Sequence, residues 1–250
     1  MVWEKENRIY SKLPLIYSYI MRKIDYKIWA EYIYSIVSED LPVKPRILEL
    51  AAGNCKLAKY LSEFYPLIIV SDISADMLKS SPGISLHKVC CDMTLLPFKN
   101  KFDLIYCAFD SINYLTSRKK ILDLFKEINS ILNAKGIFTF DVSLERNSLI
   151  HTKQPDRTGL YKGIRFKQKS EYDKLKKIHK NTFHIKLNEN EVYTEIHKQK
   201  IYSFETYFEL LELSGLYVAE CLDAFTYNKG NPGCERIQFI ARKNNGNALL

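Results

Sequence analysis

Apolar and polar positions repeat along this chain with two different periods, and the change between them divides it into segments. Residues 10–37 carry apolar and aromatic side chains at helical spacing, for example at Leu13 and Ile16, and Asp25 can cap the second of two helices there. From residue 46 to residue 142, short apolar runs alternate with segments of helical period. Such alternation predicts a parallel sheet with right-handed crossovers and helices on both faces.

Five strands are expected in that alternating region, with helices and turns between them. Ser74 and Ser117 precede two of the helical segments, where a serine side chain can cap the first turn. The expected strands cover residues 46–50, 67–70, 86–90, 102–107 and 137–142.

After Val142 the pattern changes to period 2. The run Phe183-His184-Ile185-Lys186-Leu187 and the turn residues at 188–190 predict antiparallel strands between residues 163 and 201. A helix from Ser203 to Gly215 should follow, with the glycine at its C-terminal end. Two last strands are expected at residues 217–222 and 237–241.

Composition limits the class of protein. The 250 residues are 46% hydrophobic and 26% charged, which is ordinary for a globular chain. The longest stretch without charge, residues 13–21, is far too short to cross a bilayer, and the N-terminus has no apolar segment typical of a secretory signal. We therefore expect a soluble, cytoplasmic protein without membrane contact.

Cysteine spacing gives no support for a metal site. No CxxC pair and no Cys/His cluster at zinc spacing occurs, so we expect free, mostly buried cysteines in a reducing compartment and no bound metal. The six cysteines are at positions 55, 90, 91, 107, 221 and 234.

Most of the net charge of +8 lies in one segment, residues 153–180, which holds ten Lys or Arg against three acids. With aromatic residues such as Phe166 and Tyr172 between them, these cations could contact phosphates while the rings stack on bases. The alternative, which we favour, is a solvated hairpin. The excess also suggests an acidic or phosphorylated small-molecule ligand.

Acidic residues follow the ends of four expected strands, namely Glu49, Asp72, Asp92 and Asp110. Ligands of open α/β sheets bind outside the carboxyl ends of the strands. Nineteen residues separate Gly53 from Asp72, the spacing at which an acidic side chain can bind ribose hydroxyls. A ribose-bearing cofactor is therefore expected.

The loop after the first strand favours S-adenosylmethionine over a dinucleotide. Cys55 and Lys56 stand where a pyrophosphate would require small residues. Glu49 would repel a diphosphate but suits a ligand that carries an ammonium and a sulfonium group. An NAD-dependent dehydrogenase is the less favoured alternative.

Six segments occur in an order that resembles class I S-adenosylmethionine-dependent methyltransferases over residues 45–142: Ile47–Cys55, Val70–Leu78, Cys91–Met93, Phe102–Ile105, Phe109–Leu115 and Leu132–Gly136. The regions around Tyr17 to Trp29 and Glu195 to Tyr202 resemble a subgroup of mostly uncharacterised bacterial small-molecule methyltransferases. The resemblance implies a Rossmann-like, doubly wound α/β sheet, mostly parallel with an antiparallel last strand, and a small antiparallel β insert after the fifth strand.

The same resemblance implies a division of the chain. Residues 1–145 and 203–250 would form the methyltransferase core, with a helical cap at about residues 10–40. Residues 146–202 would form the insert, over the mouth of the active site.

The resemblance also implies a cofactor site, and each residue in it has a structural alternative. Asp72 could instead cap the helix near Ser74, and Met93 could be ordinary core. The family usually has glycine where this chain has Ala51 and Cys55. On the methionine side, the resemblance implies that Glu49 interacts with the ammonium group through water, that Ala51 and Gly53 form the turn beneath the cofactor, and that the Ala108 backbone lies beside the methionine. On the nucleoside side, it implies that Asp72 binds the ribose hydroxyls, that Ile73 and Met93 contact the adenine ring, and that Asp92 accepts from the adenine amino group. Met77 belongs to the same site.

Methyl transfer is an in-line displacement, so the protein must chiefly align the acceptor and exclude water. A base is needed only to take a proton from the acceptor, and Tyr17, Tyr26, Asp110 and His197 are the candidates. For His197, pairing with Glu195 on one face of a strand is the favoured alternative, and Tyr17 could be core.

The acceptor class follows from what the chain lacks. Amino-nucleobase methyltransferases carry an Asn/Asp-Pro-Pro-aromatic tetrad after the fourth strand, where this chain has Asp110-Ser111-Ile112-Asn113. We therefore expect methyl transfer to an oxygen or nitrogen of a small molecule, with S-adenosylhomocysteine as product, by a monomer or homodimer. The alternatives are an RNA-modifying or nucleic-acid-binding protein and a non-catalytic S-adenosylmethionine-binding protein.

Overall fold

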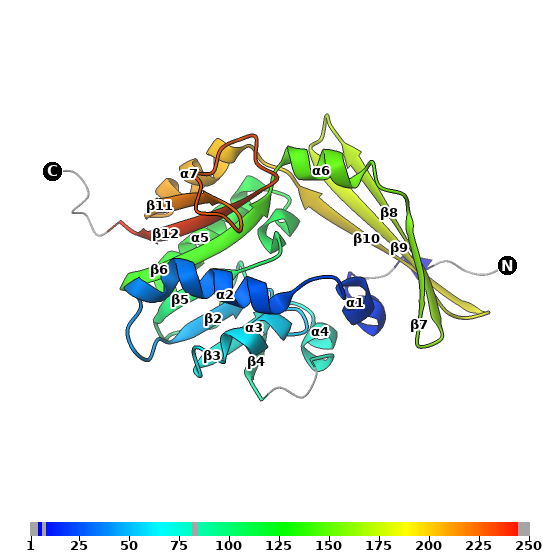
Figure 1. The fold of residues 1–250 in the computed structure, drawn as a ribbon, viewed down its shortest axis with the longest axis horizontal. Helices are drawn as coiled ribbons and strands as arrows, with labels where there is room; N and C mark the ends of the chain where they lie inside the picture. The colour runs from blue at the N-terminus through cyan, green and yellow to red at the C-terminus, as the bar shows by residue number, and fades with distance from the viewer. Residues whose placement is uncertain (1–4, 7–8, 82–84, 245–250) are drawn as a thin grey trace.

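Two sheets make up the fold of the computed structural model, which describes residues 5–6, 9–81 and 85–244 (Figure 1). The larger sheet has the strand order β11-β12-β6-β5-β2-β3-β4. The five strands from β6 to β4 are parallel, while β12 is antiparallel to β6, and β11 to β12. The strands are β2 (Ile47–Leu50), β3 (Ile68–Asp72), β4 (His87–Cys90), β5 (Phe102–Cys107), β6 (Leu132–Ser143), β11 (Leu216–Asp223) and β12 (Arg236–Lys243).

The order of strands reverses at β2, which lies between β3 and β5. The connections from β2 to β3 and from β3 to β4 extend the sheet on one side of β2. The strands that follow, β5 and β6, extend it on the other side. The loops after β2 and β5 therefore diverge and leave a crevice at the carboxyl ends, where ligands of such sheets bind. The predicted Rossmann-like fold is confirmed, with antiparallel strands at one edge.

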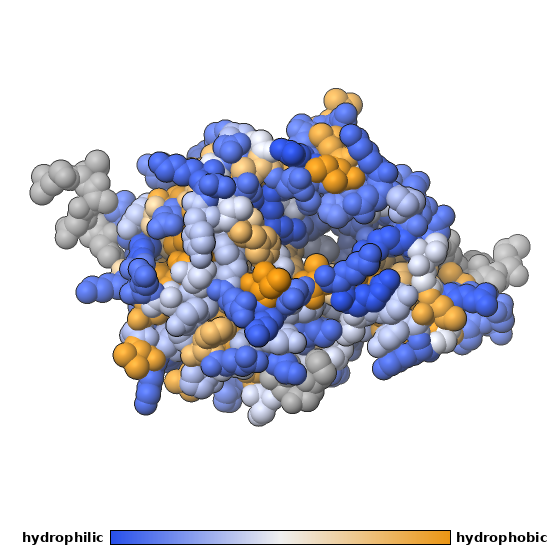
Figure 2. Space-filling model, viewed as in Figure 1, coloured by the Kyte–Doolittle hydropathy of each residue, from blue (hydrophilic) through white to orange (hydrophobic). Residues whose placement is uncertain are grey.

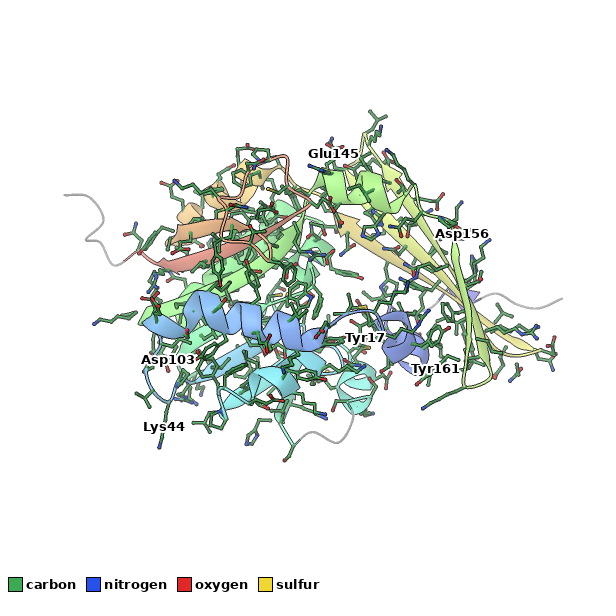
Figure 3. All side chains as sticks on the ribbon, in the orientation of Figure 1. Tyr17, Lys44, Asp103, Glu145, Asp156 and Tyr161 are labelled. Atoms are coloured by element: carbon green, nitrogen blue, oxygen red, sulfur yellow. The ribbon has the colours of Figure 1, made fainter. Side chains whose placement is uncertain are left out.

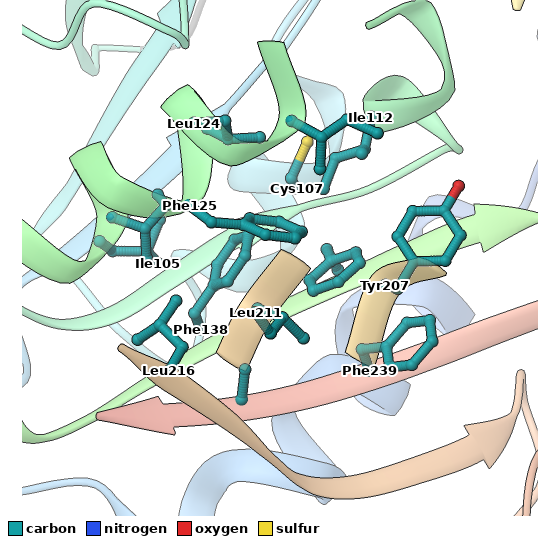
Figure 4. Packing of buried hydrophobic residues seen from close by; sticks show 14 of the residues in the cluster. Ile105, Cys107, Ile112, Leu124, Phe125, Phe138, Tyr207, Leu211, Leu216 and Phe239 are labelled. Carbon is teal, nitrogen blue, oxygen red and sulfur yellow. The ribbon is translucent and has the colours of Figure 1, made fainter. Parts of the chain in front are cut away.

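Helices cover both faces of this sheet, as the sequence pattern predicts. On one face, α5 buries the stripe Ile121, Leu124, Phe125 and Ile128 against the sheet, where Phe140 of β6 stacks on Phe239 of β12 (Figure 4). On the other face, α2 and α3 pack together over β2, β3 and β5. The helices are α2 (Tyr26–Val37), α3 (Lys56–Leu61), α4 (Ala75–Lys79), α5 (Arg118–Ile131) and α7 (Phe204–Leu213), with 3-10 turns η1 (Ser38–Asp40) and η2 (Ser111–Tyr114).

Three helix starts follow from local side-chain chemistry. Asp25, Ser74 and Ser117 accept hydrogen bonds from backbone N–H groups in the first turns of α2, α4 and α5. Ser203 precedes α7 but makes no such bond, and its hydroxyl instead pairs with that of Thr206 at 3.0 Å. Gly215 has a φ of +79°, the left-handed conformation expected after a helix.

The second sheet has the order β1-β10-β9-β8-β7. Its strands are antiparallel except β1, a short strand that the sequence pattern did not predict and that pairs in parallel with β10. Helix α1 packs on this sheet through Leu13, Ile16 and Ile20, so it lies between the two sheets (Figure 1). The elements are β1 (Lys5–Glu6), α1 (Pro14–Ile20), α6 (Glu145–His151), β7 (Arg157–Tyr161), β8 (Ile164–Asp173), β9 (Ile178–Asn188) and β10 (Glu191–Lys200).

The basic segment of residues 153–180 runs through this second sheet. Its lysines alternate with inward residues along β8, so that Lys167 and Lys169 are exposed and pair with Asp156 and Glu171 at 3.0 Å. Figure 2 shows hydrophilic side chains over much of this part of the surface. The arrangement is that of a solvated sheet face. No helix within the described ranges is long and apolar enough to cross a membrane.

Candidate active site

A cavity of about 1020 Å³ separates the carboxyl ends of the larger sheet from the inner face of the second sheet. Loops after β2, β3, β4 and β5 form one wall, and β8, β9 and β10 form the other. Helix α1, which carries Tyr17, lies between the two walls (Figure 3). The cavity is at the upper limit of the volumes usual for small-molecule sites.

The loop after β2 is built from residues in the left-handed conformation. Ala51, Gly53 and Cys55 have φ values of 51°, 56° and 59°. A Cβ atom on Gly53 would lie 3.2 Å from Met77 Cε and 3.9 Å from the Tyr17 hydroxyl, so the glycine keeps the cavity floor open. For a side chain, this conformation costs about 1–2 kcal/mol per residue. Ala51 and Cys55, where the family usually has glycine, therefore carry strain.

Asp72, at the end of β3, holds this loop in place. Its carboxylate accepts hydrogen bonds from the backbone N–H groups of Gly53 and Ser74, both at 2.8 Å. Burial raises the pKa of Asp72, while these two hydrogen bonds oppose the rise. The cap of α4 is Ser74 itself, which accepts from Met77 N, so Asp72 is not the helix cap that the sequence offered as an alternative. Asp72 lines the cavity.

Glu49 lies behind the same loop with an unsatisfied carboxylate. Its side chain is 2% exposed, it does not line the cavity directly, and its Oε2 has no hydrogen-bond partner. Burial and, to a smaller extent, the Asp72 carboxylate raise the pKa of Glu49 to about 8, although the nearby Tyr106 hydroxyl opposes the rise. A buried carboxylate without a partner costs free energy, and a nearby cation would offset that cost.

Four more residues of the predicted cofactor site line the cavity: Ile73, Met77, Asp92 and Met93. Ile73 is half exposed, and Asp92 accepts from the backbone N–H and the hydroxyl of Thr94, both at 2.8 Å. Ala108 is buried and does not line the cavity, and its carbonyl accepts a hydrogen bond from the Ser111 hydroxyl at 2.8 Å.

Asp110 lines the cavity but its carboxylate is engaged on several sides. It accepts from Gln199 Nε2 at 2.7 Å, from the Ser143 hydroxyl at 3.1 Å and from Arg236 at 3.1 Å. Its backbone N–H donates to Asp141 Oδ2 at 2.8 Å, and φ is 48°. This network fixes the loop after β5 and ties it to β10 and β12. The geometry favours a positioning role for Asp110.

Tyr17 reaches the cavity, as predicted, and its hydroxyl lies above Gly53. Burial raises the pKa of Tyr17 well above its ordinary value, with smaller contributions from nearby tyrosines and carboxylates. The hydroxyl is therefore protonated at neutral pH and can donate or accept a hydrogen bond, but it does not supply an ionised base.

The structure does not bring His197 to the cavity surface. His197 is 1% exposed, and its Nε2 lies 3.2 Å from Glu195 Oε2, which is the structural pairing that the sequence offered as the alternative. Glu195 is fully buried because it also accepts hydrogen bonds from the segment that leads into α1. The donors are the backbone N–H groups of residues 10, 11, 12 and 13 and the hydroxyl of Ser11.

Polar residues on the inner face of the second sheet were missed by the sequence analysis. Gln168, Ser170, His179, Asn181 and Gln199 all line the cavity. The sequence of β8 alternates lysines with uncharged polar residues at every second position, and this alternation indicates a polar inner face. Gln168 Oε1 and His179 Nδ1 have no hydrogen-bond partner.

Comparisons with known proteins agree with this geometry. Residues 47–136, from β2 to the start of β6, match the family described as methyltransferase domain. The chain is 27% identical to the Bacillus subtilis protein named "Putative methyltransferase YqeM", over 94% of this chain and 97% of that protein.

Solved structures share the whole fold. A S-adenosylmethionine-dependent methyltransferase from Clostridium acetobutylicum has a TM-score of 0.77 at 23% identity, over 94% of this chain and 99% of that one. The sugar N-methyltransferase KedS8 from Streptoalloteichus has a TM-score of 0.72 at 16% identity, over 97% and 96%. The sheet order, the cavity at its carboxyl edge and these matches together show that the chain has the fold of S-adenosylmethionine-dependent methyltransferases and that residues 47–136 match a methyltransferase domain.

Proposed function

We propose that this protein transfers the methyl group of S-adenosylmethionine to an oxygen or nitrogen atom of a small, polar molecule. The observation that carries the proposal is the pair of unlike cavity walls. One wall presents the acidic ends of parallel strands and a glycine loop, and the other presents uncharged hydrogen-bonding side chains. Such a cavity suits a cofactor on one side and a polar acceptor on the other.

The residues of the first wall fit the cofactor. The unpartnered Oε2 of Glu49 can interact with the ammonium group through water, and the absence of a Cβ at Gly53 leaves room beneath the ligand. Asp72 would accept hydrogen bonds from the ribose hydroxyls. Ile73, Met77 and Met93 would pack on the adenine, and Asp92 would accept from its amino group. When bound, S-adenosylmethionine supplies a methyl group already activated by the sulfonium.

The second wall supports a polar acceptor of low charge. Gln168 and Asn181 present amide groups, Ser170 a hydroxyl and His179 an imidazole. Burial and the neighbouring His151 lower the pKa of His179, which keeps the imidazole neutral at neutral pH. The lysines of β8 face the opposite side of the sheet, whereas Arg157 of the same basic segment lines the cavity with Asp156 and donates to the Ile20 carbonyl at 3.0 Å. For an acidic or phosphorylated ligand, the charge excess therefore brings one guanidinium, and no cluster of lysines, to this cavity.

The similar structures bear on the acceptor class. One is a sugar N-methyltransferase and another is an amino pentose methyltransferase, with a TM-score of 0.67 at 14% identity. Both proteins are named for sugar acceptors, which carry hydroxyl and amino groups. The uncharged polar wall of this chain would suit an acceptor of that general kind.

The remaining residues would align the acceptor and exclude water. Glu195 holds the segment before α1, and α1 covers the loop that carries Gly53. Asp110 fixes the loop after β5 on the methionine side of the site. Such positioning supplies much of the acceleration of a displacement at an activated methyl carbon.

Calorimetry combined with labelled methyl transfer tests the proposal. We expect S-adenosylmethionine and S-adenosylhomocysteine to bind, and label from methyl-tritiated S-adenosylmethionine to enter one component of a small-molecule extract of bacterial cells. Binding without transfer would indicate a non-catalytic protein. Transfer to RNA or DNA alone, with binding that weakens steeply as salt increases, would indicate a nucleic-acid substrate.

A further inference from the structure

Four side chains form a continuous hydrogen-bonded row from the cavity into the core. Tyr10 Oη donates to Tyr114 Oη at 3.1 Å, Tyr114 Oη lies 3.4 Å from His197 Nδ1, and His197 Nε2 lies 3.2 Å from Glu195 Oε2. Tyr10 and Tyr114 line the cavity. His197 and Glu195 are 1% and 0% exposed, so bulk water does not compete for their hydrogen bonds.

The surroundings of Glu195 determine which nitrogen of His197 carries the proton. Glu195 accepts from four backbone N–H groups, an arrangement that requires the lone pairs of an ionised carboxylate. Although burial opposes it, these bonds and His197 hold the pKa of Glu195 below its ordinary value. His197 therefore donates from Nε2, and in the neutral form of the ring Nδ1 presents a lone pair to the Tyr114 hydroxyl.

Among the described residues, Glu195 is the charged group that is hydrogen-bonded to the histidine ring. The rings of Tyr10, Phe183 and Tyr114 contact it at centroid distances of 4.8, 5.2 and 6.0 Å. Its cross-strand neighbour on β9 is Asn181, which lines the cavity. The imidazole thus lies between one carboxylate and one hydroxyl, within the described part of the chain.

The cavity end of this row lies beside the proposed cofactor site. The carbonyl of Tyr10 accepts from the Ser74 hydroxyl at 3.2 Å, and the Tyr10 and Tyr17 rings are 6.4 Å apart. Tyr114 belongs to η2, which directly follows Asp110 after β5. The two hydroxyls therefore face the region between the glycine loop and the polar wall of the second sheet.

Holding the segment before α1 does not by itself require this row. Glu195 alone accepts the backbone N–H groups, and an apolar residue at position 197 would fill the same space without needing two partners. A buried carboxylate, an imidazole and a hydroxyl in sequence have the same order of roles as catalytic triads, in which a carboxylate orients a histidine that takes a proton from a hydroxyl.

We propose, on the basis of the function proposed above, that Tyr114, His197 and Glu195 form a proton relay that takes the proton from the methyl acceptor. The oxygen or nitrogen of the acceptor forms a bond to the methyl carbon while the carbon–sulfur bond breaks, and that electron pair stays on sulfur. The acceptor's proton passes to Tyr114 Oη, and the proton of that hydroxyl passes to His197 Nδ1. The resulting imidazolium is stabilised by Glu195. Tyr114 touches the acceptor, whereas Glu195 is a positioning residue.

The protonation state of Tyr114 agrees with this role. Burial raises the pKa of Tyr114 well above its ordinary value, so the phenol does not ionise at neutral pH. It can still receive one proton as it gives up another. Histidine is the group in the row that holds the extra proton.

The test compares Tyr114→Phe, His197→Gln and the double variant with the wild type, on whichever component of the cell extract accepts the label. Tyr114→Phe removes only one oxygen from a half-buried residue, so it tests the relay even if His197→Gln is unstable. His184→Gln, on the outer face of β9, is the matched control. Thermal unfolding verifies the fold, and calorimetry verifies binding of S-adenosylhomocysteine.

We expect each single variant to lower kcat by about a hundredfold or more, the usual contribution of a general base, while the Kd of S-adenosylhomocysteine changes less than about twofold. The double variant should lose no more than either single variant, because each interrupts the same relay. Additive losses, or kcat within about threefold of the wild type in Tyr114→Phe, would overturn the relay and leave the proposed function standing. A wild type that binds S-adenosylmethionine but methylates nothing would overturn both.

Discussion

Glu49→Gln tests the cofactor side of the site through stability as well as binding. The pKa of Glu49 is raised from 4.5 to about 8, so between these values the native protein holds a proton that the unfolded chain has released. The contribution of Glu49 to the free energy of unfolding therefore decreases as the pH rises through this interval. At about 1.4 kcal/mol per unit, the loss between pH 5 and pH 8 is about 3.5 kcal/mol as an upper bound.

Urea unfolding of both proteins at pH 5 and pH 8 measures this contribution. Other groups titrate equally in the wild type and the variant, so the difference between the two proteins isolates position 49. We expect Glu49→Gln to gain stability relative to the wild type as the pH rises from 5 to 8. A difference that is the same at both values would refute the claim that a buried, protonated carboxyl lies behind the loop.

Ligand binding gives a second measurement on the same variant. At pH 7 about nine in ten Glu49 side chains are protonated in the free protein. If the ammonium of S-adenosylhomocysteine restores the ionised form, binding should release nearly one proton in the wild type and fewer in Glu49→Gln. Calorimetry in buffers of different ionisation enthalpy counts these protons. If the wild type and Glu49→Gln release the same number of protons and bind with the same affinity, Glu49 does not interact with the cofactor.

Three further substitutions test the loop, the ribose contact and the N-terminal segment. Asp72→Ala should weaken S-adenosylhomocysteine binding by at least about 1 kcal/mol in calorimetry, since hydrogen bonds to a charged group are lost, and unchanged affinity would exclude the ribose contact. Ala51→Gly should raise the free energy of unfolding in urea by up to about 1 kcal/mol, because relief of left-handed strain exceeds the entropy cost of glycine, and a decrease would contradict it. Glu195→Gln should lower that free energy by about 2–3 kcal/mol at pH 7. Because the pKa of Glu195 is lowered in the folded protein, the ionised carboxylate stabilises the fold at neutral pH, and this stabilisation is lost as the pH falls through the folded-state pKa. The free energies of unfolding of the wild type and Glu195→Gln should therefore become equal in acid.

Features that depend on neighbouring residues could be predicted from the sequence. The apolar runs fixed the strands of the larger sheet, and Asp25, Ser74 and Ser117 fixed the starts of three helices. The carboxyl ends of β2, β4 and β5 were predicted correctly, whereas β3 runs two residues farther than expected, to Asp72, and β6 begins at Leu132, five residues before the expected start. The predicted placement of Asp72 at the cavity is found in the structure. Period and capping act within a few residues, so one sequence is enough to read them.

Features that depend on distant residues could not be predicted. Glu195 binds backbone groups more than 180 positions away, and nothing local to β10 marks that partner. The same holds for Asp110, whose engagement by Gln199 and Arg236 joins three separate segments. A carboxylate at a strand end looks the same in the sequence whether it faces a ligand or a guanidinium.

Three features that lower the stability of an unliganded fold lie on the cofactor side of the site. Ala51 and Cys55 hold left-handed conformations, and the buried Glu49 keeps an oxygen without a partner. Each lowers stability, and all three surround one loop. Packing in the core, for example between the stacked rings of Phe140 and Phe239, offsets the free energy that these features cost. Local conflict of this kind is expected where a ligand completes the structure, and a cationic nucleoside would satisfy the Glu49 carboxylate that the protein leaves unpaired.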